Sequence, residues 1–183
     1  MKFHTLLAAS AAVLAMGSGG HAAQVAALVG DGTIAIIDTK TMSTSNLTLS
    51  GTNGALVGID VRPADGMLYG LAADGTLYTI ALDGTATMKS KLETMLSGGV
   101  LATVDFNPVA DRLRVIGSDG TSLRVNVDDG KVTTDGSLKY AESDANTGKS
   151  PKVVAGAYTN SMKGTKETAL YDVDATTGSL VKQ

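Results

Sequence analysis

The sequence contains no cysteine, no tryptophan and only two histidines, His4 and His21, both within the first 22 residues. The rest of the chain therefore has no imidazole or thiolate. This excludes a Ser-His-Asp triad, a cysteine nucleophile, a haem ligand of the usual kinds and an ordinary zinc or copper site. No disulfide can stabilise the fold, so stability must come from a packed core, for which a hydrophobic content of 43% is sufficient.

The first 22 residues have the composition of a secretory signal peptide. Lys2 supplies the charged start, an apolar run extends from Leu6 to Met16, and small residues lead to a cleavage point after Ala22. The run is too short to span a bilayer as a helix, and no later apolar run is long enough. We therefore expect an exported protein, periplasmic or extracellular, without membrane insertion.

The remaining composition argues against nucleic-acid binding. The chain has a formal net charge of −3 and only 4% aromatic residues. Nucleic-acid binders usually combine a basic stripe with aromatic side chains on which bases stack. We expect no nucleic-acid partner.

Two long stretches of the sequence repeat each other. Residues 56–84 (LVGIDVRPADGMLYGLAADGTLYTIALDG) resemble residues 101–130 (LATVDFNPVADRLRVIGSDGTSLRVNVDDG), and Asp60 aligns with Asp105 at an offset of 45 residues. Partial copies precede and follow this pair. A fixed period of this length is typical of repeat architectures. The predicted units are a partial unit 23–54, a unit 55–98, a unit 99–150 and a partial unit 151–183.

Within a unit, apolar and polar residues alternate with a period of two, as in residues 76–82 and 121–127. This alternation predicts strands with one buried face. Asp-Gly pairs between the runs predict tight hairpins. In the first full unit, strands are expected at 56–62, 67–72, 76–82 and 87–92. Residues 133–152 are weakly patterned and are expected to form an exposed excursion.

Four antiparallel strands in about 45 residues are typical of a propeller blade. The sequence thus predicts an all-β, propeller-like repeat fold. The partial units at both ends suggest an incomplete ring, whose unpaired strand edges would favour a homo-oligomer.

The blocks LVGIDVRPADGMLYGL, VDFNPVADRLRVI, SLRVNVDDG and VVAGAYTN occur in this order and together resemble the secreted bacterial family called domain of unknown function 4394. The resemblance covers nearly the whole chain after the signal peptide. It implies a propeller-like all-β fold and an extracytoplasmic setting, and it implies no established activity. The family pattern usually continues beyond LYDVDATTGSLVKQ, so this chain resembles a version shortened at its C-terminus.

Asp60 and Asp105 occupy equivalent positions, near Arg62 and Asn107 respectively. They could form a ring of carboxylates around a central channel that binds a cation or a basic ligand. They could instead make hydrogen bonds between blades or cap turns. We favour the architectural interpretation, because a residue repeated with the period more often serves the fold than a site.

The basic residues concentrate at Arg112, Arg114 and Arg124, and strand alternation places the first two on one face. They could bind an anionic ligand such as a carboxylate or an acidic polysaccharide. A solvated sheet face, with ion pairs to Asp111 or Asp128, is the interpretation that we favour.

No metal site or cofactor is predicted. The acidic turns at 128–130 and 142–146 contain oxygen ligands that calcium accepts, but they lack the spacing of an EF-hand loop. We therefore expect a non-catalytic β-repeat protein that presents a binding surface to a protein or an envelope polymer. The alternative is an enzyme that uses carboxylates or calcium on an envelope or extracellular substrate, a chemistry that needs no histidine.

Overall fold

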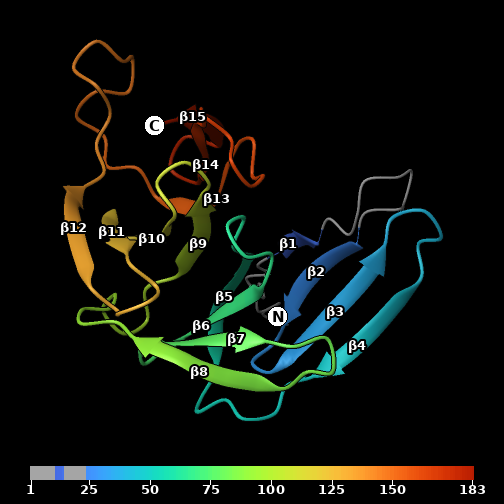
Figure 1. Ribbon diagram of the computed structural model, residues 1–183. Helices are drawn as coiled ribbons and strands as arrows, with labels where there is room; N and C mark the ends of the chain where they lie inside the picture. Colours follow the sequence, from blue (N-terminus) through green and yellow to red (C-terminus); the bar gives the residue numbers. More distant parts are fainter. Residues whose placement is uncertain (1–10, 15–23) are drawn as a thin grey trace, which may run out of the picture.

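The computed structural model describes residues 11–14 and 24–183. All of its regular elements are β-strands, and they form four antiparallel sheets that follow one another along the chain (Figure 1). No helix in the described part of the chain is long and apolar enough to cross a membrane. The predicted all-β repeat fold is confirmed.

The first two sheets contain four strands each, in chain order. Sheet I consists of β1 (Ala11–Leu14), β2 (Gln24–Val29), β3 (Thr33–Asp38) and β4 (Thr44–Thr48). Sheet II consists of β5 (Leu56–Val61), β6 (Leu68–Ala72), β7 (Thr76–Ile80) and β8 (Ala86–Lys91). The four strands predicted in the first full unit agree with sheet II to within about two residues at each end.

The third sheet again has four strands, and the fourth has three. Sheet III consists of β9 (Ala102–Asn107), β10 (Arg112–Gly117), β11 (Thr121–Val125) and β12 (Val132–Ser137). Sheet IV consists of β13 (Val153–Tyr158), β14 (Leu170–Asp174) and β15 (Ser179–Lys182).

Two features of these sheets were not expected. Residues 132–137 form β12, so the predicted excursion at 133–152 was too long and begins only after this strand. The weak pattern there arises because β12 is an outer strand whose side chains are mostly exposed, so neither face is apolar. In addition, β1 pairs with β2 although it lies within the predicted signal peptide.

The same turn closes the hairpin between the second and third strands of sheets II and III. Gly75 and Gly120 have φ values of 85° and 89°, which L-residues with a side chain rarely adopt. The Asp before each glycine accepts a hydrogen bond from the backbone N–H two residues later, at 2.9 Å for Asp74 and 3.0 Å for Asp119. The Asp-Gly-Thr sequences at 74–76 and 119–121 therefore form the same turn, and this turn fixes the register of the flanking strands.

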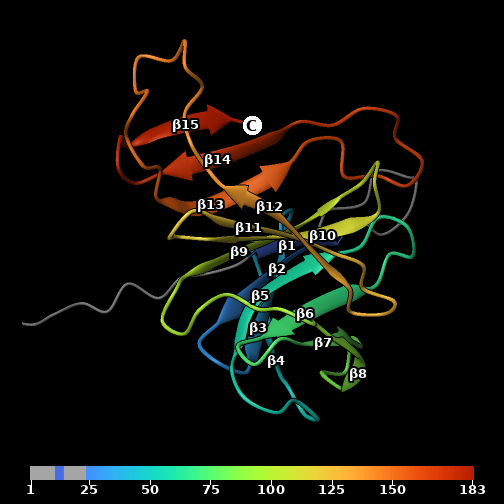
Figure 2. The same ribbon diagram turned by 90° about the vertical axis from the view of Figure 1, so that its left-hand side faces the viewer.

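The four sheets are arranged along an arc, with sheet I at one end and sheet IV at the other (Figure 1). The first strand of each sheet contacts the first strand of the next, from β1 to β5 to β9 to β13. No comparable contact among the described residues joins β13 to β1, so the arc is not a closed ring. Figure 2 shows the succession from the side, from β15 at the top down to β4 and β8.

A separate apolar cluster lies between each pair of neighbouring sheets. Ile34 and Ile59 belong to the cluster between sheets I and II, Phe106 belongs to the cluster between II and III, and Ile116 and Leu170 belong to the cluster between III and IV. Each inner sheet therefore buries both of its faces. The core is a series of interfaces between sheets, as expected for stacked repeats.

Candidate functional site

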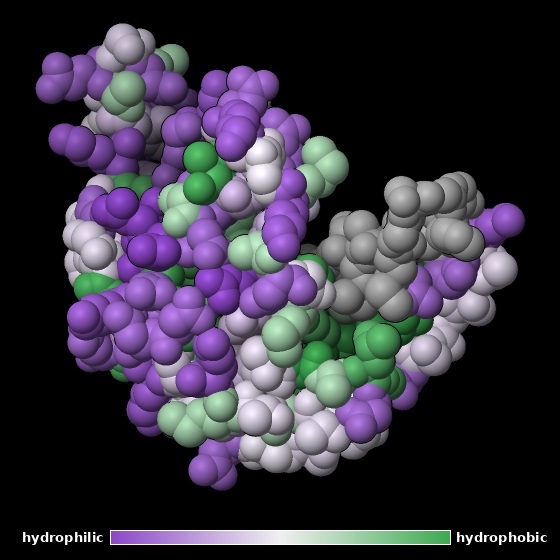
Figure 3. Space-filling model, in the orientation of Figure 1, coloured by the Kyte–Doolittle hydropathy of each residue, from purple (hydrophilic) through white to green (hydrophobic). Residues whose placement is uncertain are grey.

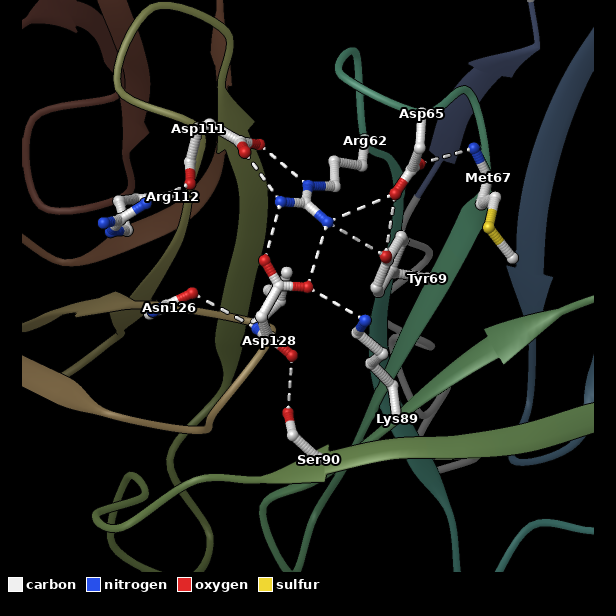
Figure 4. A network of polar contacts seen from close by, with 11 residues as sticks. Arg62, Asp65, Met67, Tyr69, Lys89, Ser90, Asp111, Arg112, Asn126 and Asp128 are labelled. Atoms are coloured by element: carbon white, nitrogen blue, oxygen red, sulfur yellow. Dashed lines mark hydrogen bonds and ion pairs between the residues drawn. The ribbon is translucent and has the colours of Figure 1, made fainter.

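Arg62 lies at the joint between sheets II and III and is only 9% exposed (Figure 4). Its guanidinium makes a two-point contact with Asp111, with distances of 2.8 Å from Nε and 2.6 Å from Nη2. It also donates to Asp65, Asp128 and the Tyr69 hydroxyl. The bonds to Asp111, above all, raise the pKa of Arg62 above its ordinary value, so the side chain stays charged.

This Arg62 network joins side chains that are far apart in the sequence. Lys89 adds a second cation by pairing with Asp128 at 2.9 Å. Five charged side chains from both sheets form hydrogen bonds and ion pairs with one another here. The network therefore connects sheet II to sheet III. The ligand-binding role considered for Arg62 remains a prediction.

Asp60 and Asp105 both form hydrogen bonds to the next sheet. Asp60 Oδ2 accepts the backbone N–H of Phe106 at 2.7 Å, and Asp105 Oδ1 accepts that of Tyr158 at 3.0 Å. These are the bonds between blades expected from the architectural interpretation. The repeated Asp thus links β5 to β9 and β9 to β13 at equivalent positions.

Burial perturbs both of these carboxyl groups. Loss of solvation raises the pKa of Asp60 to about 7 and that of Asp105 to about 8. The negative charge of Asp60 contributes further to the raised pKa of Asp105. Burial also raises the pKa of Asp172 on β14, whose Oδ2 accepts a bond from the Gln183 side chain at 2.7 Å. Asp172 was missed in the sequence because it lies outside the repeated Asp position.

Asn107, the counterpart of Arg62 in the repeat, has a local role. Its Oδ1 accepts the backbone N–H groups of Val109 and Ala110 at 3.0 and 2.9 Å. The side chain therefore caps the turn that leads into β10. The ligand-binding role considered for Asn107 remains a prediction.

Arg112, Arg114 and Arg124 lie on one face of sheet III. Arg112 and Arg114 are two residues apart on β10, and Arg114 is the cross-strand neighbour of Arg124 on β11. This face is directed toward sheet IV, because Ile116 on the same face packs against Leu170. Figure 4 shows Arg112 directed away from the Arg62 network.

The ion pairs expected for these arginines were assigned to the wrong carboxylates. Asp111 and Asp128 bind Arg62 instead, on the joint with sheet II. Arg114 and Arg124 share Asp135 of β12, at 2.5 and 2.6 Å. The error arose because residues 133–152 were not predicted to form a strand, so Asp135 was not considered.

A shallow groove of about 400 Å³ opens on this face. Its lining consists of Ala110, Arg112, Arg124, Asn126, Lys131 and Thr133. Sheet IV covers the inner part of the face, where the Arg114 Nε donates to the Tyr158 hydroxyl at 3.3 Å. The groove begins where this cover ends, and Figure 3 shows hydrophilic surface over β10–β12 on the left of the view.

The groove has an excess of positive charge. Arg112 donates to the carbonyl oxygens of Ala110 and Asp111, and among the described residues it forms no ion pair. Lys131 is 72% exposed and contacts Asp129 at a distance of 3.7 Å. Within the described part of the chain, Arg124 pairs only with Asp135, which it shares with Arg114. Such a surface can bind an anion through guanidinium groups, with Asn126 and Thr133 as neutral polar neighbours.

The acidic turns considered for calcium use their carboxylates to cap the backbone. Asp129 Oδ1 accepts the Lys131 N–H at 3.1 Å, and Asp144 Oδ1 accepts the Asn146 N–H at 2.7 Å. Over residues 11–14 and 24–183, no group of three or more acidic, histidine or cysteine side chains is arranged to hold a metal ion. Calcium remains part of the enzyme alternative, which nothing here tests.

The model of the family described as Domain of unknown function (DUF4394) matches residues 33–183. The chain belongs to this family. The match begins at β3 of sheet I and extends through sheets II, III and IV, so the resemblance inferred from the ordered sequence blocks is confirmed. No curated protein matches the chain significantly.

Solved structures share the fold of this DUF4394 chain. A structural genomics protein of unknown function from Bacteroides thetaiotaomicron has a TM-score of 0.57 at 20% identity, over 93% of this chain and 40% of its own. An auxiliary nutrient binding protein from the same organism has a TM-score of 0.53 at 15% identity, over 87% of this chain and 44% of its own. The chain therefore spans less than half the length of these two propeller-like proteins.

Several side chains of the groove were not singled out from the sequence. Asn126, Lys131 and Thr133 come from the end of β11, the following turn and β12. Because Lys131 and Thr133 flank the start of a strand that was not predicted, their approach to Arg112 and Arg124 could not be inferred. The alternation of side chains along β10 and β11 was the one signal in the sequence that pointed to this face.

Proposed function

We propose that this DUF4394 protein is a non-catalytic, exported β-repeat protein that binds an anionic, carboxylate-bearing ligand in the groove of sheet III. The observation that carries the proposal is the convergence of Arg112, Arg124 and Lys131 on one open depression. Arg112 is anchored by two backbone carbonyl oxygens and Arg124 by Asp135, so these two guanidinium groups are positioned before a ligand arrives. Preorganised cations lose little conformational freedom on binding, which favours affinity.

The ligand class follows from the lining. Guanidinium groups match the two oxygens of a carboxylate, and amide and hydroxyl groups match the hydroxyls of a sugar. Asn126 supplies such an amide and Thr133 such a hydroxyl, and both line the groove together with Arg112 and Arg124. The groove is open and about 400 Å³ in volume, which suits one or two residues of a longer polymer. An acidic polysaccharide is therefore the ligand that we propose.

The alternative of a carboxylate enzyme has one supporting observation, the raised pKa of Asp60 and of Asp105. Such a value would suit a general acid at neutral pH. Both carboxyls, however, are buried at joints between sheets and accept backbone N–H groups. The same raised pKa values are explained by burial at a structural joint, so binding remains the proposal that we favour.

The proposal can be tested by calorimetric titration with a galacturonic acid trimer. The wild-type chain should bind this trimer and should not bind its neutral methyl ester. Arg112→Ala removes a guanidinium without breaking an ion pair and should weaken binding about tenfold or more, as expected for a lost charge-assisted hydrogen bond. Binding should also weaken as the salt concentration rises.

Lys91→Ala is the matched control. It removes one positive charge from sheet II, where Lys91 forms an exposed pair with Asp74 at 2.9 Å. Affinity for the trimer should stay unchanged in this variant. Equal binding of the methyl ester, or equal weakening by both substitutions, would contradict a specific anion site in the groove.

A further inference from the structure

The outer face of sheet IV has the same construction as a face that is buried elsewhere in the molecule. Sheet II presents Tyr69, Leu71 and Leu77 to sheet III, and all three are almost completely buried, at 2%, 0% and 0% exposed. The strand registers identify the counterparts of these residues in sheet IV. Tyr69 is opposite Asp60, and Leu71 is opposite Leu77.

The counterparts are Tyr171, Val173 and Leu180. Tyr171 is opposite Ala157 on β13, as Tyr69 is opposite Asp60 on β5, and Val173 is opposite Leu180 as Leu71 is opposite Leu77. Leu170 and Asp172, which alternate with Tyr171 and Val173, are buried and point toward sheet III. The three counterparts therefore face the open end of the arc, where they are 37%, 40% and 67% exposed.

The equivalent face of sheet III shows that this apolar character is not a general property of the position. There the three positions are Arg114, Ile116 and Ser122, and the arginine donates to the serine hydroxyl at 3.0 Å. The outer face of sheet IV thus has the apolar pattern of sheet II. No other sheet among the described residues packs against this outer face. A contiguous exposed apolar face of this kind is typical of an interaction surface.

The other end of the arc carries a complementary face. When the Asp-Gly-Thr turns are aligned, Val25, Ala27 and Val29 of β2 correspond to Leu113, Val115 and Gly117 of β10. Leu113 and Val115 are the residues with which sheet III packs against sheet II. Val25 and Ala27 are partly exposed, and Val29 is 50% exposed.

We propose that two copies of this chain associate head to tail, with the outer face of sheet IV of each copy packed against sheet I of the other. The joint continues the packing of sheet III on sheet II, with Tyr171, Val173 and Leu180 in the places of Tyr69, Leu71 and Leu77. Because each copy carries both faces, the same joint forms twice in the dimer and the two copies are related by a two-fold axis. This inference is independent of the groove and its ligand.

The number of sheets supports two copies as the occupant. One chain supplies four sheets, and propeller rings usually contain about four to eight. The chain also corresponds to 40% and 44% of the two longer solved proteins that share its fold. Two copies therefore supply about as much chain as one of those proteins.

Light scattering coupled to size exclusion gives the first test. The wild-type chain should elute as a dimer at micromolar concentration, and a Val173→Asp, Leu180→Asp double variant should be a monomer with an unchanged far-UV circular dichroism spectrum. The control is Leu82→Asp, at a 60% exposed residue in the turn between β7 and β8, outside both end faces, and this variant should remain a dimer. A monomeric wild-type chain, or a dimer that persists in the double variant, overturns the proposal.

Crosslinking gives the second test, because the chain has no cysteine of its own. One preparation carries Val29→Cys and the other Leu180→Cys, and each is treated with a short bismaleimide, alone and after mixing. Head-to-tail association predicts a crosslinked dimer only in the mixture. Crosslinking of Leu180→Cys alone would show that two sheet IV faces meet each other, and it would overturn the head-to-tail dimer. Assemblies larger than a dimer would also overturn it.

Discussion

Replacement of Arg62 by methionine tests whether the joint between sheets II and III depends on the Arg62 network. Methionine has a similar length and packs well, so the change removes charge and donors without opening a large cavity. The lost contacts are the two-point bond to Asp111 and the weaker bonds to Asp65, Asp128 and Tyr69. Each hydrogen bond to a charged group contributes about 1.5–3 kcal/mol to the free energy of unfolding.

The full penalty for breaking a buried ion pair, about 3–5 kcal/mol, does not apply here. The Arg62 side chain is 10% exposed, but those of Asp111 and Asp128 are 37% and 53% exposed, so their charges can be hydrated in the variant. We therefore expect Arg62→Met to lower the free energy of unfolding by about 2–3 kcal/mol. Arg62→Lys keeps the charge but loses the two-point geometry, and it should fall between wild type and Arg62→Met.

The free energy of unfolding is measured from urea titrations followed by far-UV circular dichroism, at one fixed protein concentration because association would add to the apparent stability. Lys91→Met serves as the control, since the Lys91–Asp74 pair is exposed on both sides and should cost less than about 1 kcal/mol. If Arg62→Met costs no more than Lys91→Met, the network does not hold the two sheets together and the reasoning fails.

Two further outcomes follow from burial and backbone geometry. The raised pKa values of Asp60 and Asp105 mean that the unfolded chain ionises first, so stability present below about pH 4 should be lost as the pH rises through about 7 and 8. In the Asp60→Asn, Asp105→Asn double variant the melting temperature should fall much less between pH 5 and 8.5, because the amide cannot ionise and its oxygen can still accept the backbone N–H from the neighbouring sheet. An equal or steeper fall would contradict this. Gly130 has a φ of 77° and an added Cβ would overlap the backbone carbonyl oxygen of Lys91. Gly130→Ala should therefore cost clearly more in urea unfolding than Gly54→Ala, which has a φ of 91° and open space around it and should cost about 1 kcal/mol; equal losses would show that sheet III can shift to accommodate the methyl group.

The strands and turns were predictable from the sequence because their signals are local. Alternation with a period of two marks β7, β10 and β11, and an Asp-Gly pair forms a turn through local contacts alone. The constant offset of 45 residues then identified the repeated sheet. Local signals failed at β12, where the strand is an outer one and buries little of its surface.

The role of the repeated Asp was also within reach of the sequence. Asp60 and Asp105 recur with the period, which indicates a contact made once in every repeat, and the structure contains that contact between neighbouring sheets. The sequence could not identify which backbone N–H each Asp binds, or how deeply each carboxylate is buried. Those depend on the distance between two sheets, and this distance is set by side chains from both.

The composition alone excluded chemistry that requires histidine or cysteine beyond residue 22, and the repeat alone determined that the chain builds successive antiparallel sheets. Only the tertiary structure decided which charges meet. Asp111 and Asp128 bind Arg62 from 49 and 66 residues away, and Asp135 joins Arg114 to Arg124. The tertiary structure also decided that Tyr171 and Val173 face an open end while their counterparts in sheet II are buried. The physical reason is that alternation fixes which side chains share a face, whereas the neighbouring sheet decides what that face contacts.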